Sequence, residues 1–68
     1  MPVVKIIEVI ASSDISIDDA IRNAVAEVSK TVHNIDSVFV KDIKAHVKGN
    51  QVTTFGVICK ISFRVDEK

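Results

Sequence analysis

The sequence predicts an α+β domain of β-α-β-β order, with one helix packed on a three-stranded antiparallel sheet. Only residues 16–34 have the apolar spacing of a long amphipathic helix, and β-branched runs lie on either side of them. A Gly-Asn pair at 49–50 separates the last two runs, as in a hairpin. We expect the strand order 1-3-2, because a crossover helix makes the first two strands parallel and the most apolar strand belongs between them.

The first strand is expected from Val3 to Ile10, where β-branched residues predominate around one Lys and one Glu. Pro2 precedes this run, and proline is tolerated at the start of a strand. The polar residues 11–16 are expected to connect the strand to the helix. Residues 66–68, at the other end of the chain, are expected to form a solvated tail.

The helix is expected from residue 16 or 17 to about residue 32. Ser16 is a favoured N-cap residue, and Asp18 and Asp19 add negative charge where the helix dipole favours it. Asn34 tolerates the left-handed conformation that often closes a helix. The apolar face, with i, i+3, i+4, i+7 spacing, consists of Ile17, Ala20, Ile21, Ala24, Val25, Val28 and Val32.

The last two strands are expected to form a hairpin whose loop residues are Gly49 and Asn50. The apolar pairs of this hairpin would then face the helix. The expected register pairs Lys48 with Gln51, Val40 with Cys59 and Val38 with Ile61.

The opposite face of the hairpin has no second helix to cover it. Three large apolar residues on it are therefore expected to meet another subunit, a ligand or both. The residues predicted for this face are Ser37, Phe39, Lys41, Ile43, Gly56, Ile58, Lys60 and Ser62.

Size and composition favour a homo-oligomer. The 68 residues are interpreted as a single domain, 1–68, and so short a chain buries only about 60% of its unfolded surface. Cys59 is the only cysteine, so no disulfide within the chain supplements the core, and no zinc spacing is present. With 47% hydrophobic residues, the chain has more apolar side chain than one small core can hide.

Charge and motifs argue against several function classes. Nine basic and nine acidic residues cancel, and the three aromatic residues are all Phe, so no nucleic-acid or anionic-membrane partner is expected. Lys5 and Glu8 interrupt the apolar start and no small-residue cleavage site follows, which favours a cytoplasmic protein. No nucleophile stands beside a base and no glycine-rich phosphate loop is present, so we expect a binding or storage protein and not an enzyme.

Three segments carry a family resemblance: KIIEVIASSDISIDDAIRNAVAEVSKTVHNID at 5–36, FVKDIKAHVKGNQV at 39–52 and KISFRV at 60–65. Together they resemble the dodecins, small bacterial and archaeal proteins of β-α-β-β fold that assemble into hollow dodecamers. The resemblance implies a homododecameric shell that binds or stores a small molecule.

Typical dodecins bind riboflavin, FMN or FAD in pairs between symmetry-related subunits. A Trp shortly after the helix sandwiches the flavin, and a Gln on the last strand bonds its ring edge. By this resemblance Ser37 stands at the Trp position, Gly56 at the Gln position, and Lys44 where an Arg commonly meets a phosphate. Lost stacking forfeits about 1–3 kcal/mol per ring by analogy with bases, and Lys lacks the bidentate fork of Arg. We therefore expect flavin binding to be weakened or lost.

Two hypotheses remain open at this point. In the first, the shell binds flavin weakly or takes another planar or phosphate-bearing ligand at the three aligned positions. In the second, it is a purely structural dodecamer without flavin, with calcium or another cation as a stabilising ion. Asp14, Asp18 and Asp19 could supply oxygen ligands, although helix capping alone explains them, and no metal site is predicted.

Overall fold

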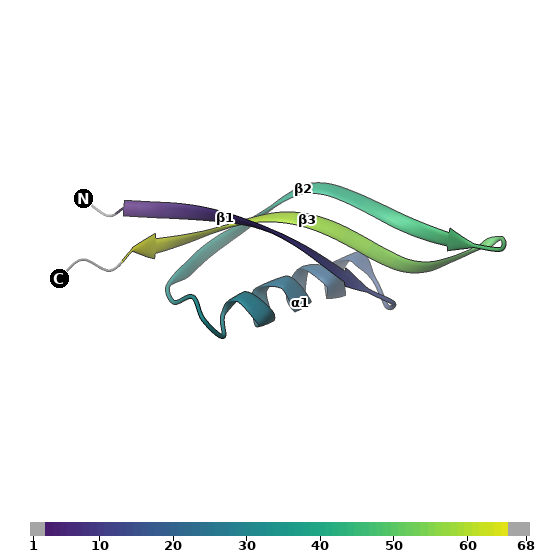
Figure 1. The fold of residues 1–68 in the computed structure, drawn as a ribbon, viewed down its shortest axis with the longest axis horizontal. Helices are drawn as coiled ribbons and strands as arrows, with labels where there is room; N and C mark the ends of the chain where they lie inside the picture. The colour runs from purple at the N-terminus through teal and green to yellow at the C-terminus, as the bar shows by residue number, and fades with distance from the viewer. Residues whose placement is uncertain (1–2, 66–68) are drawn as a thin grey trace.

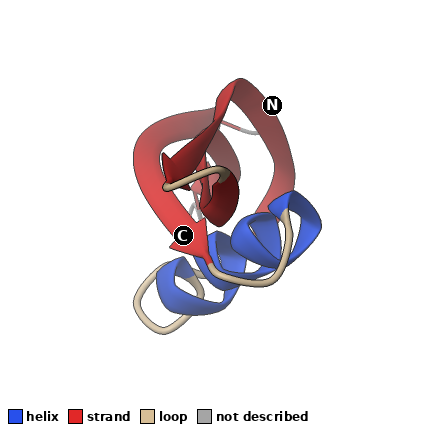
Figure 2. Ribbon diagram, turned by 90° about the vertical axis from the view of Figure 1, so that its right-hand side faces the viewer, coloured by secondary structure: helices blue, strands red, loops and turns tan. Residues whose placement is uncertain are grey.

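The computed structural model describes residues 3–65 and has the predicted β-α-β-β order (Figure 1). Strands β1 (Val3–Ser13), β2 (Ile35–Lys48) and β3 (Gln51–Val65) form one antiparallel sheet in the order β1-β3-β2, which confirms the expected topology. Helix α1 (Ile17–Val28) lies against one side of the curled sheet (Figure 2). The expectations for Pro2 and for the tail 66–68 fall outside the described residues.

The β2-β3 hairpin projects well beyond the helix, whereas the start of β1 and the end of β3 lie side by side at the opposite end of the molecule (Figure 1). The principal extents of 54 × 20 × 13 Å reflect this projection. Among the described residues, no helix has the length and apolarity needed to span a bilayer.

Helix α1 begins as predicted but ends earlier, at Val28 instead of near residue 32. Ser29 is the C-cap, and its hydroxyl donates to the carbonyl of Ala26 at 2.9 Å. The N–H of Thr31 donates to the carbonyl of Val28 at 3.1 Å, three residues back, so the final turn tightens. Serine and β-branched threonine are weak helix formers, which explains the early end. Asn34 has a φ of 65°, in the left-handed region, as expected.

A serine network fixes the turn between β1 and α1. The Ser16 hydroxyl caps the helix by accepting from the N–H of Asp19 at 2.9 Å. The Asp19 carboxylate accepts from the Ser13 hydroxyl at 2.7 Å, and Ser13 Oγ also accepts from the N–H of Ile15 at 2.9 Å. The strand is longer than predicted because residues 11–13 pair with β3, and only residues 14–16 connect the sheet to the helix.

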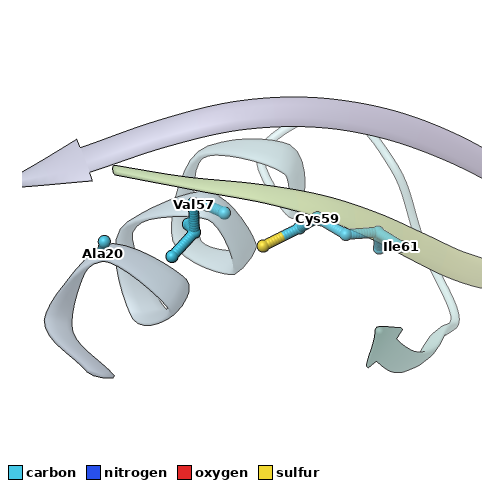
Figure 3. Packing of buried hydrophobic residues seen from close by; sticks show 5 residues of the cluster. Ala20, Val57, Cys59 and Ile61 are labelled. Carbon is cyan, nitrogen blue, oxygen red and sulfur yellow. The ribbon is translucent and has the colours of Figure 1, made fainter. Parts of the chain in front are cut away.

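The core lies between α1 and the middle strand (Figure 3). Cys59 is fully buried there, as a small hydrophobe, and burial raises the pKa of its thiol above the ordinary value. Small alanines on the helix let its backbone approach the sheet closely. The core residues, each no more than 3% exposed, are Ala20, Ala24, Val57, Cys59 and Ile61.

The hairpin register agrees with the prediction at its loop and in the core, but it shifts between these points. One shift falls between Val40 and Asp42, so Lys41 is an extra residue on β2. Beyond it Ile43 pairs with Val57 and shares its helix-facing side. The predicted placement of Ile43 on the opposite face is therefore wrong, because an extra residue reverses the alternation of a strand.

Candidate functional site

The sheet face opposite α1, called the outer face from here on, carries side chains from all three strands. Direct partners in an antiparallel ladder point to the same face, so each row combines one residue of β3 with its neighbours on β1 and β2. In order along the sheet, the rows are Ile6, Ser62 and Ser37; Glu8, Lys60 and Phe39; Ile10, Ile58 and Asp42; and Ser12, Gly56 and Lys44.

This outer face is rich in exposed apolar side chains. Ile10 is 77% exposed, Phe39 65% and Ile6 62%. Within residues 3–65, the single helix lies on the other face and leaves this one uncovered. A soluble monomer rarely exposes so much contiguous apolar surface, so the outer face has the character of a contact surface.

Ser37 lies on the outer face and is engaged within the chain. Its Oγ lies 2.6 Å from the Oγ of Ser62, its direct partner on β3. The Ser62 hydroxyl also lies 3.5 Å from the carbonyl oxygen of Ser37. The two hydroxyls therefore satisfy each other, and this position offers no aromatic surface on which a ring could stack.

Lys44 and Gly56 lie side by side as direct partners in the ladder. A Cβ built on Gly56 would meet Cγ of Lys44 at 3.6 Å and Cε at 3.9 Å, so the aliphatic stem of Lys44 lies over the glycine. Because the middle strand has no side chain here, a hollow of about 140 Å³ opens beside it. The hollow is lined by Ile10, Asp42, Ile43, Lys44, Gly56, Val57 and Ile58.

The three aligned positions do not form one site within a protomer. Ser37 pairs with Ser62, whereas Lys44 pairs with Gly56, six residues away on β3. At about 3.3 Å per residue this separates them by about 20 Å along the strand. The structure thus brings together Lys44 and Gly56 but leaves Ser37 apart.

The charges of the outer face are partly paired across the sheet. Lys41 Nζ lies 3.2 Å from a carboxylate oxygen of Glu8, although β3 runs between their strands. Both side chains are about half exposed, so solvent screens this pair. Among the described residues, no ion pair involves Lys44 or Asp42.

The acidic residues at the helix start are used in local contacts. Asp18 pairs with Arg22 at 3.0 Å, and Asp19 accepts from Ser13. At the hairpin end, His46 Nδ1 lies 2.9 Å from Thr54 Oγ1. Within residues 3–65, no three His, Cys, Asp or Glu side chains gather as metal ligands would.

Sequence reasoning missed Ile10 and Asp42 as parts of this face. Ile10 belongs to β1, whose individual residues were not assigned to a face, although the order β1-β3-β2 already implied that β3 has neighbours on both sides. Asp42 reaches the outer face only because of the extra residue at Lys41, for which the sequence has no local signal.

A β-α-β-β chain with one helix-covered and one open sheet face defines a class of small α+β proteins. The sequence model of the dodecin family matches residues 3–66, so the chain belongs to the dodecin family. A curated dodecin from Thermus thermophilus is 29% identical over 65 residues, which cover 96% of this chain and 94% of that protein.

Solved dodecin structures share the fold. Dodecin from Streptomyces coelicolor aligns with a TM-score of 0.91 at 30% identity, over 98% of this chain and 96% of that chain. A Thermus thermophilus dodecin with one tryptophan replaced by phenylalanine aligns with a TM-score of 0.93 at 28% identity, over 98% of this chain and 100% of that chain. Family and fold together support a dodecin-like small-molecule binding protein.

Proposed function

We propose that this protein is a cytoplasmic, non-enzymatic binding or storage protein that assembles into a hollow homododecamer and holds a small molecule, with flavin binding weakened or lost. The observation that carries the proposal is the uncovered outer face, where Ile10, Phe39 and Ile6 are each more than 60% exposed. Membership of the dodecin family supports both the assembly and the ligand class. Neither nucleic acid nor a membrane is proposed as a partner.

Assembly is supported by the separation of the aligned positions. Ser37 lies about 20 Å along the strand from Gly56 and Lys44, so one protomer cannot bring all three to one ligand. Copies related by symmetry can combine Ser37 of one with Lys44 of another. Contact between copies would also cover the exposed apolar side chains of the outer face.

Weakened flavin binding is supported by the side chains present. Ser37 is bonded to Ser62, Gly56 has no group to pair with a ring edge, and Lys44 is a point charge. The lost stacking of about 1–3 kcal/mol corresponds to about 5- to 150-fold in affinity.

Riboflavin fluorescence tests the proposal. The unmodified protein should quench riboflavin weakly or not at all, and Ser37→Trp combined with Gly56→Gln should recover quenching with a gain of about a hundredfold in affinity. Glutamine fits at position 56 because its Cβ would meet only ordinary contacts. The variant Lys30→Trp, at an exposed position in the turn that follows α1, controls for quenching by tryptophan elsewhere.

Two results would contradict the proposal in different ways. Tight quenching by the unmodified protein would show that flavin binding persists without the ring and the amide. No quenching by an assembled double variant would show that the flavin pocket has closed, which favours the purely structural dodecamer. Light scattering gives the oligomeric state of each sample.

A further inference from the structure

The hollow beside Gly56 has the volume of one ring. It measures about 140 Å³, and an engineered apolar cavity of about 150 Å³ holds benzene. Pockets for drug-sized ligands usually measure about 300–1,000 Å³. A single ring or a branched aliphatic group matches this volume.

The walls of the hollow are mainly apolar. Ile10 and Ile58 form one row beside it, and Gly56 leaves the gap because it has no side chain. A Cβ at Gly56 would meet Cγ of Lys44 at 3.6 Å, an ordinary contact distance, so a small side chain could be added there without a clash. This surface suits a hydrocarbon group.

Two opposite charges stand at the β2 side of the same hollow. Lys44 and Asp42 both line it, and as residues two apart on one strand their Cα atoms are separated by about 7 Å. One carboxylate oxygen of Asp42 accepts from the N–H of Ile43 at 3.1 Å. Neither side chain is in an ion pair among the described residues.

We propose that this hollow binds a free apolar α-amino acid with a branched aliphatic or one-ring side chain. The ligand's carboxylate meets Lys44, its ammonium group meets Asp42, and its side chain lies against Ile10 and Ile58. The two protein charges cancel, which favours a zwitterion over a phosphate dianion. This proposal rests on the proposed function, because it names the ligand class of the same small-molecule binding protein.

Ligand-observed NMR on the purified, assembled protein tests the proposal with three matched probes. L-phenylalanine carries both charges, 3-phenylpropionate lacks the ammonium group, and 2-phenylethylamine lacks the carboxylate. We expect L-phenylalanine to bind with a dissociation constant of about 1 mM and each analogue about tenfold more weakly. Equal binding of the three probes would overturn the proposal.

Charge variants assign each contact. Lys44→Met should weaken L-phenylalanine and 3-phenylpropionate by about tenfold each and leave 2-phenylethylamine unchanged. Asp42→Asn keeps an acceptor for the Ile43 N–H. It should weaken the binding of L-phenylalanine and 2-phenylethylamine, which carry an ammonium group, and leave that of 3-phenylpropionate unchanged. Lys48→Met and Asp36→Asn, which remove exposed charges outside the hollow, should change nothing. A pattern in which both charge variants affect all three probes alike would overturn the assignment.

Filling the hollow tests its location. Gly56→Val should abolish binding of all three probes while the oligomer persists. If this variant fails to assemble, Gly56→Ala adds one methyl at an ordinary contact distance and should weaken binding. Full binding by either assembled variant would overturn the proposal.

The failure of this inference differs from failure of the proposed function. If the assembled protein binds none of the probes even at probe concentrations well above about 1 mM, the amino-acid proposal alone is overturned. A monomer that still binds L-phenylalanine overturns the proposed dodecamer and leaves the hollow as the site. Light scattering on the same samples separates the two results.

Discussion

The two faces of the sheet differ although the same strand supplies both. On the helix-facing side, Val57, Cys59 and Ile61 are at most 1% exposed, because α1 covers them. On the outer face, the intervening residues of β3 stand among apolar neighbours such as Ile10, which is 77% exposed. The comparison teaches that this chain completes only one of its two apolar surfaces by itself. Within residues 3–65, the other surface stays uncovered.

Breaking the helix-facing side should have the largest effect. Ala24 is 3% exposed in the core, so Ala24→Asp buries a carboxylate without a partner. The expected loss exceeds about 4 kcal/mol, comparable with the whole stability of a small domain. Circular dichroism should show an unfolded chain, whereas Ala26→Asp, on the exposed helix face, should fold. A folded Ala24→Asp protein would mean that the helix is oriented differently.

Breaking the outer face should act on assembly. Ile10→Asp places a charge in the uncovered apolar row, where a contact between copies would have to bury it. Light scattering should show smaller species, and the melting temperature should depend on protein concentration. The exposed change Thr31→Asp serves as the control. An Ile10→Asp oligomer of unchanged size and stability would remove the outer face from the interface.

The hydrogen bonds of Ser13 in the turn between β1 and α1 should contribute less to stability. Ser13→Ala removes the hydroxyl that donates to Asp19 and accepts from the N–H of Ile15. A loss of about 1–2 kcal/mol is expected, seen as a melting temperature lower by about 4–8 °C per kcal/mol. Ser29→Ala, which removes one exposed bond at the helix end, should cost less. Equal losses would show that the Ser13 network adds nothing beyond a single cap.

The smallest effect concerns Cys59 and pH. Burial raises the pKa of its thiol, so the folded state keeps the proton that the unfolded state releases first. The resulting stability is fully present below the ordinary thiol pKa and is lost as pH rises toward the raised value. Thermal melts should show that raising the pH from 8 to 10, about where a free thiol ionises, destabilises the native protein more than the variant Cys59→Ala. An identical pH dependence for the two proteins would show that the thiol ionises equally well when folded.

The features predicted correctly from the sequence depend on local patterns. The helix face, the Ser16 cap and the Asn34 conformation follow from spacing and from residue chemistry within one turn. The strand order follows from connection rules. The pairs of Cys59 with Val40 and of Ile61 with Val38, predicted from the loop at Gly49, are correct because the register shift between His46 and Val47 is cancelled by the one at Lys41.

The features that sequence reasoning missed depend on long-range pairing. Without the extra residue at Lys41, the predicted register would place Lys44 opposite Phe55 on the helix-facing side. The contact of Lys44 with Gly56, and therefore the hollow, could not be derived from the spacing of residues. The longer β1 has the same origin, because residues 11–13 become strand only through their partners on β3.

The extra residue at Lys41 also divides β2 into two segments of opposite phase. Before it, even-numbered residues such as Val38 and Val40 face the core. After it, even-numbered residues such as Asp42 and Lys44 lie on the outer face. Substitutions in the second segment can therefore vary the surface offered to ligands or to other copies while the first segment keeps its packing. The irregularity thus lets one strand carry core residues in its first segment and surface charges in its second, on positions of the same parity.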